Sequence, residues 1–161
     1  MRQAALTKRK VDVSNITWDD VFDKMEYDRL QKTFTVIAPK VKPEEILRET
    51  RDVILHQGPM NTMICEGSYA PRSMRPLVEH MKDQYGMIDF HQYVSFSGES
   101  QTFGKHNDTV SVMIVPIIGD IGYVVDGLGE VFMDLGDILY IPKYVYHEPL
   151  ISGPRATLSF S

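Results

Sequence analysis

Two histidines and one aspartate in the C-terminal half of the sequence could together hold a metal ion. His106 and Asp108 flank Asn107, and His147 follows later in the chain. In an extended chain, residues two apart point to the same face, so the imidazole of His106 and the carboxylate of Asp108 can converge on one ion. Two imidazoles and a carboxylate on one side of an ion leave the opposite coordination positions open, which suits iron(II). Zinc accepts the same ligand types, and the alternative without a metal is that both histidines are ordinary turn and rim residues.

The segments that must position these residues read as short strands from Phe90 onward. Apolar runs alternate there with glycine, proline and aspartate, which is typical of strands joined by tight turns. Strands this short need mutual burial, so a sandwich or closed barrel is the expected architecture. His106 then closes the second strand and His147 opens the seventh. The predicted strands are 90–97, 102–106, 110–116, 122–125, 130–134, 137–141, 146–151 and 156–161.

The first part of the chain has the spacing of helices instead. Thr17 can cap a helix whose apolar residues recur every three or four positions. No linker separates the two parts, so we expect one domain, 1–161, in which a helix-rich part, 1–89, packs on the strand-rich core, 90–161. The predicted elements of the first part are a helix beginning at Trp18, a strand at 34–37, a helix from Pro43 towards Gly58, and a helix at 74–85.

Composition narrows the class of protein. The chain of 161 residues has a formal net charge of −5, which argues against nucleic-acid binding through a broad basic face. Its one basic cluster, Arg2 with residues 8–10, is expected to be a solvated terminus. Cys65 is the sole cysteine, so no internal disulfide can form and the context reads as reducing. The N-terminus lacks the apolar core of a signal peptide, and no apolar run approaches the roughly 20 residues of a membrane helix. A soluble, cytoplasmic protein without a membrane partner is expected.

The residues around the predicted ligands resemble a known family. The stretch 103–108, Phe-Gly-Lys-His-Asn-Asp, and the stretch 136–148, from Gly136 through His147, are similar to JmjC and cupin-type 2-oxoglutarate- and iron(II)-dependent oxygenases. The resemblance covers the strand-rich part of the chain. It implies a double-stranded β-helix (cupin or jelly-roll) barrel in which His106, Asp108 and His147 hold iron(II). It also implies that 2-oxoglutarate and dioxygen are co-substrates, and that oxidative decarboxylation to succinate is coupled to hydroxylation of a C–H bond.

The same resemblance implies a place for 2-oxoglutarate. A dicarboxylate that chelates iron needs a cation at its far end, and the planar fork of arginine matches a carboxylate. Arg155 precedes the last predicted strand with Thr157 facing the same way, and many of these oxygenases have an Arg-x-Ser or Arg-x-Thr pair there. Tyr93 and Tyr123 could add phenol hydrogen bonds, although barrel tyrosines more often only pack. JmjC-type members commonly use a lysine or arginine where this chain has Ile121, so either Arg155 takes that role or 2-oxoglutarate is not the co-substrate.

Substrate contacts must come from outside the short predicted hairpin at 126–129, where larger relatives carry insertions. Three sources stay open: the helix-rich part, the loop-like segment 65–75 acting as a lid, and a partner subunit in a homo-oligomer. The substrate itself, whether protein, nucleotide or metabolite, is not identified by the sequence.

Three functions follow from these residues. The first is an iron(II)- and 2-oxoglutarate-dependent hydroxylase. The second is a metal-binding cupin with other chemistry, such as a cofactor-independent dioxygenase or an isomerase, and the third is a non-catalytic cupin-fold binding or structural module. Arg155 separates the first from the second, because only the first requires a cation at the far end of a dicarboxylate.

Overall fold

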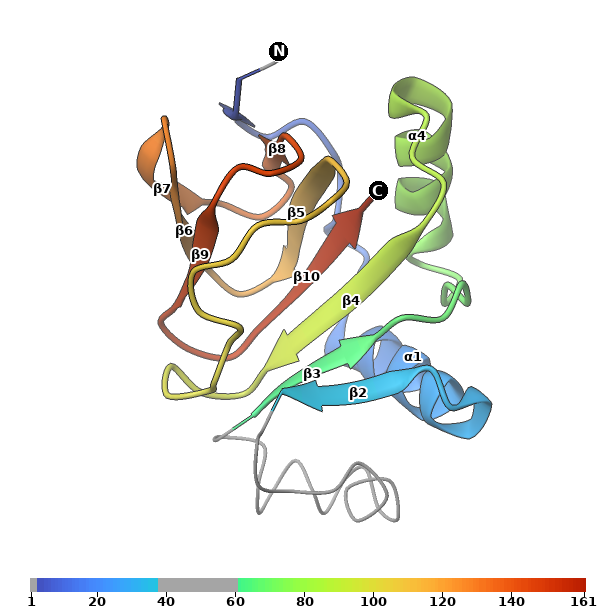
Figure 1. Ribbon diagram of the computed structural model, residues 1–161. Coiled ribbons are helices and arrows are strands. Elements are labelled where there is room, and N and C mark those ends of the chain that lie inside the picture. The colour runs from blue at the N-terminus through green and yellow to red at the C-terminus, as the bar shows by residue number, and fades with distance from the viewer. Residues whose placement is uncertain (1–2, 38–60) are drawn as a thin grey trace.

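The computed structural model describes residues 3–37 and 61–161, which form two helices and two antiparallel sheets (Figure 1). The helix predicted from Pro43 towards Gly58 lies outside the described residues. The helices are α1 (Trp18–Gln31) and α4 (Arg75–Tyr85). The strands are β1 (Ala5–Thr7), β2 (Phe34–Ile37), β3 (Thr62–Cys65), β4 (Phe90–Ser95), β5 (Val112–Ile118), β6 (Ile121–Val125), β7 (Gly129–Met133), β8 (Ile138–Ile141), β9 (His147–Ile151) and β10 (Arg155–Phe160).

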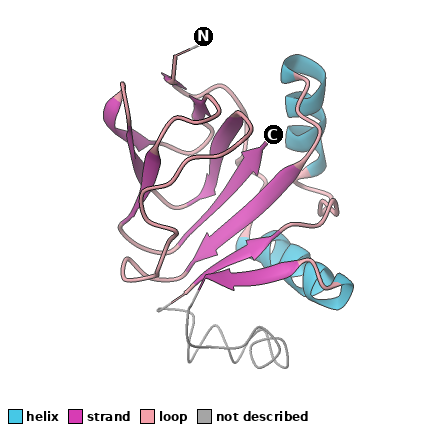
Figure 2. Ribbon diagram, viewed as in Figure 1, coloured by secondary structure: helices cyan, strands magenta, loops and turns pink. Residues whose placement is uncertain are grey.

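The two sheets differ in size. The major sheet has seven strands in the order β1-β8-β5-β10-β4-β3-β2, and the minor sheet has three in the order β7-β6-β9. Both helices lie on the side of the major sheet away from the minor sheet (Figure 2). This arrangement is a double-stranded β-helix barrel with helices packed against it, so the predicted fold class is confirmed.

Strand periodicity divides the side chains of the major sheet between two environments, because successive residues of a strand point to opposite faces. On β10, Ala156, Leu158 and Phe160 belong to the apolar cluster that also contains Met25 of α1. Arg155, on the other face, lines a cavity inside the barrel. One face of the sheet therefore stabilises the helices, and the other is available for chemistry.

Both described helices begin close to where local signals predict, and the end of α4 is also predicted. The backbone N–H of Thr17 donates to the Asp20 carboxylate at 2.8 Å, which is one half of a capping box, and α1 begins at Trp18 as predicted. Helix α4 begins at Arg75, one residue after the predicted start at 74. It ends before Gly86, whose φ of 71° is the left-handed conformation that glycine adopts without a Cβ penalty.

The first part of the chain also supplies strands that its helical spacing did not indicate. Strand β2 is the predicted one, but β1 pairs with β8 and β3 lies between β2 and β4. A strand of three residues, such as β1, is too short to show a recognisable alternation of polar and apolar residues. All four residues of β3 are buried, so its sequence shows no alternation between polar and apolar positions.

The strand predicted at 102–106 is wrong. The chain there forms a loop with two isolated bridges, one from Gln101 to Asn61 and one from His106 to His147. Gly104 has a φ of 67° and its N–H donates to the Thr102 hydroxyl at 3.0 Å. A left-handed residue and a local side-chain turn interrupt an extended ladder.

Residues 8–10 are exposed to solvent as expected, but the segment is not free of contacts with the rest of the described chain. Lys8 Nζ lies 2.9 Å from the buried carboxylate of Asp137. The backbone N–H groups of Lys10 and Val11 both donate to the carbonyl of Gly136, at 3.0 and 3.1 Å. These contacts tie the segment to the turn before β8.

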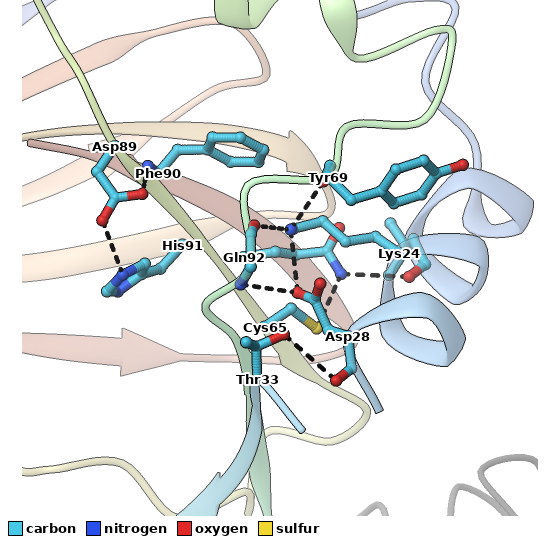
Figure 3. A network of polar contacts seen from close by, with 11 residues as sticks. Lys24, Asp28, Thr33, Cys65, Tyr69, Asp89, Phe90, His91 and Gln92 are labelled. Atoms are coloured by element: carbon cyan, nitrogen blue, oxygen red, sulfur yellow. Dashed lines mark hydrogen bonds and ion pairs between the residues drawn. The ribbon is translucent and has the colours of Figure 1, made fainter. Parts of the chain in front are cut away.

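A buried lysine fixes the loop after β3 to helix α1 (Figure 3). Lys24 Nζ donates to the Asp28 carboxylate at 3.0 Å and to the carbonyls of Gly67 and Tyr69 at 2.6 and 2.9 Å.

Cys65 is buried beside this network, and burial raises the pKa of its thiol to about 12. No residue of the segment 65–75 lines the barrel cavity, so the lid predicted there gains no support from the structure. None of the described helices is long and apolar enough to cross a membrane.

Candidate functional site

The three predicted ligands lie together. His106, Asp108 and His147 each offer one ligand atom, a ring nitrogen or a carboxylate oxygen. These three atoms all lie within 4.8 Å of one another. The backbones of the two histidines pair directly. The N–H of His106 donates to the carbonyl of His147 at 3.0 Å, and the N–H of His147 donates to the carbonyl of His106 at 2.8 Å. The carbonyl of Asp108 accepts from the N–H of Tyr144 at 2.8 Å. Main-chain hydrogen bonds therefore hold all three residues in place.

The ring orientation of both histidines is fixed in the same way. His106 Nδ1 lies 2.8 Å from the carbonyl oxygen of Gly104, and His147 Nδ1 lies 3.0 Å from that of Val145. A carbonyl oxygen can only accept, so both Nδ1 atoms carry a proton, and in the neutral form of each ring the lone pair is then on Nε2. Such a carbonyl partner is the usual arrangement behind a metal-bound histidine.

The electrostatics of the cluster also suit a cation. His147 is 3% exposed, and burial together with nearby His106 lowers its pKa, although the Val145 carbonyl and Asp108 act in the opposite direction. A neutral imidazole is the form that binds a metal. His147 Nε2 lies 3.5 Å from the Asp108 carboxylate, and the two histidine rings are 4.4 Å apart between centroids. The donor set of two imidazole nitrogens and one carboxylate fits a divalent metal ion.

The cluster opens into a cavity within the barrel. The walls of the cavity include the three predicted ligands together with Tyr93, Tyr123 and Arg155. The structure thus brings six of the seven predicted site residues to one space.

Arg155 is a buried cation whose hydrogen-bond partners are neutral. It is 2% exposed; its Nε donates to the Ser95 hydroxyl at 3.1 Å and its Nη1 to the Thr157 hydroxyl at 2.6 Å. In the described part of the chain no carboxylate forms an ion pair with it. Burial lowers the pKa of Arg155, and the phenols of Tyr123 and Tyr93 oppose that change. A guanidinium has five N–H donors, so three can serve an anion in the cavity.

Tyr93 and Tyr123 lie within electrostatic reach of both charged groups of the cavity. Burial raises the pKa of each phenol, nearby Asp108 adds to the increase, and Arg155 opposes it. The ring of Tyr123 is 6.4 Å from that of His147 between centroids. Both phenols can therefore meet a molecule that contacts the ligand cluster and Arg155 together.

Thr157, the seventh predicted residue, does not line the cavity; its hydroxyl accepts a hydrogen bond from Arg155, which does. Ile121, on strand β6 of the minor sheet, is buried in an apolar cluster that includes residues of both sheets, so there is no cation at the position noted from the sequence. The predicted short hairpin is confirmed, with Val125 paired to Gly129. The helix-rich part does contribute to the cavity wall, through Ile37 and Thr62.

Sequence reasoning missed three polar residues of the cavity wall, Thr62, Thr102 and Ser159, and also Ser95, whose hydroxyl accepts a hydrogen bond from Arg155. Ser95 is two residues after Tyr93 on one strand, so it shares its face, and that spacing could have revealed it. Thr62 could not be found in this way, because β3 was not predicted and only the strand register places Thr62 opposite Ser95.

Comparisons with known proteins bear on the fold. No protein-family model matches the sequence, and no curated protein does so. The ribosomal oxygenase YcfD of Escherichia coli, in complex with cobalt and 2-oxoglutarate, aligns over 99% of this chain and 48% of its own, with a TM-score of 0.71 and 17% identity. A second structure of E. coli YcfD gives a TM-score of 0.70 and 14% identity over 99% and 50% of the two chains. Its complex with cobalt and succinic acid gives 0.68 and 14% over 99% and 48%.

The chain therefore spans about half the length of these solved structures. At such identities the likeness establishes the fold, and the resemblance in fold that the motifs indicated is confirmed.

Proposed function

We propose that this protein is an iron(II)- and 2-oxoglutarate-dependent oxygenase that hydroxylates a C–H bond of its substrate. The observation that carries the proposal is one cavity lined both by a two-histidine, one-carboxylate cluster and by a buried arginine without a carboxylate partner in the described residues. The structures of YcfD with cobalt and with 2-oxoglutarate or succinic acid support it.

Each residue has a distinct task in this proposal. His106, Asp108 and His147 hold the metal, with the histidine rings oriented by the carbonyls of Gly104 and Val145. Iron(II), when bound, supplies the activation of dioxygen. Arg155 binds the remote carboxylate of 2-oxoglutarate through a charge-assisted fork, and Thr157 orients the guanidinium.

The two tyrosines complete the binding of the co-substrate. Burial raises the pKa of Tyr93 and of Tyr123, so both phenols stay protonated near neutral pH and donate hydrogen bonds to a carboxylate. Asp108 is partly exposed, with 38% of its side chain accessible, which leaves the metal side of the cavity accessible to a substrate.

A metal-binding cupin that does not use 2-oxoglutarate is the second candidate. The observation that favours it is the apolar Ile121, where JmjC-type oxygenases commonly have a cation. A non-catalytic cupin-fold module is the third, and it would bind no metal tightly.

The test is an anaerobic titration of the iron(II)-loaded protein with 2-oxoglutarate. We expect a saturable, weak charge-transfer band in the visible region. The variants His106→Ala, Asp108→Ala and His147→Ala should each lose tight iron binding and keep the wild-type circular dichroism, because apolar strands carry the stability of the barrel. His91→Ala is the matched control, since its ring faces Asp89 outside the cavity at 3.6 Å.

The outcomes separate the three candidates. Wild-type iron content in all three ligand variants would remove the proposal. Iron binding without any response to 2-oxoglutarate would favour the metal-binding cupin, and no metal binding by the wild type would favour the non-catalytic module.

A further inference from the structure

Tyr144 is one of three non-glycine residues with a positive φ among those that the structure describes. Its φ is 65°, in the left-handed region, which a residue with a Cβ adopts only at a cost in free energy. The residue is 61% exposed, so packing of its ring does not explain the conformation. Strained residues persist where the surrounding structure fixes them, and they cluster at functional sites.

The turn that contains Tyr144 contacts two of the three proposed metal ligands. The N–H of Val145 donates to the carbonyl of Pro142 at 3.2 Å and closes the turn. The N–H of Tyr144 donates to the carbonyl of Asp108 at 2.8 Å. The carbonyl of Val145 lies 3.0 Å from His147 Nδ1. One turn therefore holds Asp108 by its backbone and His147 by its ring.

The positive φ decides which way the central peptide of this turn faces. Lys143, the second residue of the turn, is not among the residues with a positive φ, so the turn is of type II. A type II turn needs a positive φ at its third residue, which favours glycine or asparagine there. In a type I turn the central peptide is turned over, and the N–H of residue 144 would point away from Asp108. A return of residue 144 to a negative φ would therefore break this hydrogen bond.

His106 is oriented by a residue in the same conformation. Its Nδ1 lies 2.8 Å from the carbonyl of Gly104, whose φ is 67°. Glycine adopts a positive φ without a Cβ penalty. Each histidine therefore follows a left-handed residue, but only the one before His147 is strained.

We propose that Tyr144 is a positioning residue for the metal site, and that it acts through its left-handed backbone and not through its phenol ring. The inference rests on the metal site of the proposed function, and it applies whether or not 2-oxoglutarate binds there. Loss of a group that orients metal ligands typically lowers metal affinity by about 10- to 100-fold. A substitution that accepts a positive φ should keep the affinity even without the ring, and one that opposes it should not.

The experiment titrates metal-free variants of the full chain with cobalt(II), followed by visible absorption, because cobalt(II) binds the same donor types as iron(II). Tyr144→Gly and Tyr144→Asn remove the ring but accept a positive φ, so their affinities should lie within about 3-fold of that of the wild type. Tyr144→Val is β-branched and opposes a positive φ, and should bind about 10- to 100-fold more weakly. In the metal-free protein, the amide hydrogen of residue 144 should exchange faster in Tyr144→Val than in Tyr144→Gly.

Lys32→Val is the matched control. Lys32 is also exposed and left-handed, with a φ of 62°, but it ends helix α1 and does not line the cavity. Valine at this position should lower the free energy of unfolding, as it should at position 144. The affinity for cobalt(II) should stay at the wild-type level.

Equal cobalt(II) affinity in Tyr144→Gly and Tyr144→Val overturns the inference, because the backbone conformation would then not matter. Weaker binding in Lys32→Val also overturns it, since a general loss of stability would explain the effect. A loss of more than about 10-fold in Tyr144→Gly overturns it even if Tyr144→Val does not fold, because the ring would then be needed.

Two results for the wild type separate this inference from the proposed function. A wild type that binds neither cobalt(II) nor iron(II) rejects the metal site, and with it both proposals. A wild type that binds metal but not 2-oxoglutarate rejects the proposed function alone.

Discussion

Lys24 and Arg155 both carry a positive charge into the interior, one beneath helix α1 and one inside the barrel. Lys24 has three N–H groups, and all three are used: one on the carboxylate of Asp28 and two on the carbonyls of Gly67 and Tyr69. Its ammonium also lies 4.6 Å from the centre of the Phe90 ring. Nothing remains with which Lys24 could bind a further molecule.

Arg155 differs in each of these respects. Its partners are the neutral hydroxyls of Ser95 and Thr157, and it faces a cavity. A buried charge costs free energy unless it is paired. The comparison teaches that a buried cation with a complete set of partners holds the fold together, whereas one with an incomplete set facing a cavity is suited to bind an anion.

The largest expected effect is on ligand binding by Arg155→Ala. Deleting one partner of a charge-assisted, partly desolvated contact costs about 2–5 kcal/mol, or roughly 30- to several-thousand-fold in 2-oxoglutarate affinity. Iron content should be unchanged. Arg155→Lys should recover only part of the loss, because a point charge does not reproduce the fork. Unchanged 2-oxoglutarate affinity in Arg155→Ala would mean that Arg155, like Lys24, does not bind a ligand.

The opposite pattern is expected for Lys24→Met. Removal of the lysine leaves the Asp28 carboxylate buried without its cation, which typically costs about 3–5 kcal/mol of unfolding free energy. Chemical denaturation measures this loss. The folded variant should bind iron and 2-oxoglutarate as the wild type does, because Lys24 is on the helix side of the sheet.

A double variant sharpens this prediction. Lys24→Met combined with Asp28→Leu removes both charges, and replacing a buried pair by apolar residues is often close to neutral. The double variant should therefore be more stable than Lys24→Met alone. If it is not, the stability comes from the contacts of Lys24 with the Gly67 and Tyr69 carbonyls, or from the hydrogen bond that the Gly67 N–H donates to Asp28, rather than from the ion pair.

The two cations also differ in how well the sequence predicted them. Arg155 was identified through its motif with Thr157 and through the resemblance to a family. The three residues proposed as metal ligands were predicted because His106 and Asp108 are two residues apart and His147 follows a recognisable glycine-led strand. Lys24 was not singled out, because its partners Gly67 and Tyr69 come from a loop distant in sequence.

The errors in the fold have the same physical origin. Strand β3 lacks alternation because every residue in it is buried, and the loop at 102–106 was read as a strand because the left-handed conformation of Gly104 is not visible in its apolar pattern. Local periodicity predicts elements and the residues they carry. It does not predict the register between distant strands. That register is what places Thr62 opposite Ser95 and Ser95 opposite Arg155.

A smaller effect is expected from Gly67→Ala. A Cβ at Gly67 would collide with the Asp28 carboxylate oxygen Oδ1 and would lie 2.7 Å from the Thr33 hydroxyl. Overpacking of this kind costs about 1–3 kcal/mol, which denaturation can resolve. Gly153→Ala is the control, since nothing lies within 4 Å of its Cβ position. Equal stability of the two variants would mean that the loop after β3 can move away from α1, and that the Lys24 network is less rigid than its contacts indicate.

The smallest effect is expected for Lys105, the exposed cation that precedes His106 in the sequence. Its Nζ lies 2.8 Å from the Asp126 carboxylate, but the side chains are 54% and 51% exposed, so water and salt screen the pair. Lys105→Ala should therefore change the unfolding free energy by much less than Lys24→Met, and iron content should stay at the wild-type level. The reason is that the neighbouring His106 is fixed by its two backbone hydrogen bonds to His147. The unfolding free energies of Lys105→Ala, Asp126→Asn and the double variant that combines them, compared with that of the wild type, isolate the contribution of the Lys105–Asp126 pair. A loss of iron in Lys105→Ala would mean that surface charge, and not the backbone pairing, positions the first ligand.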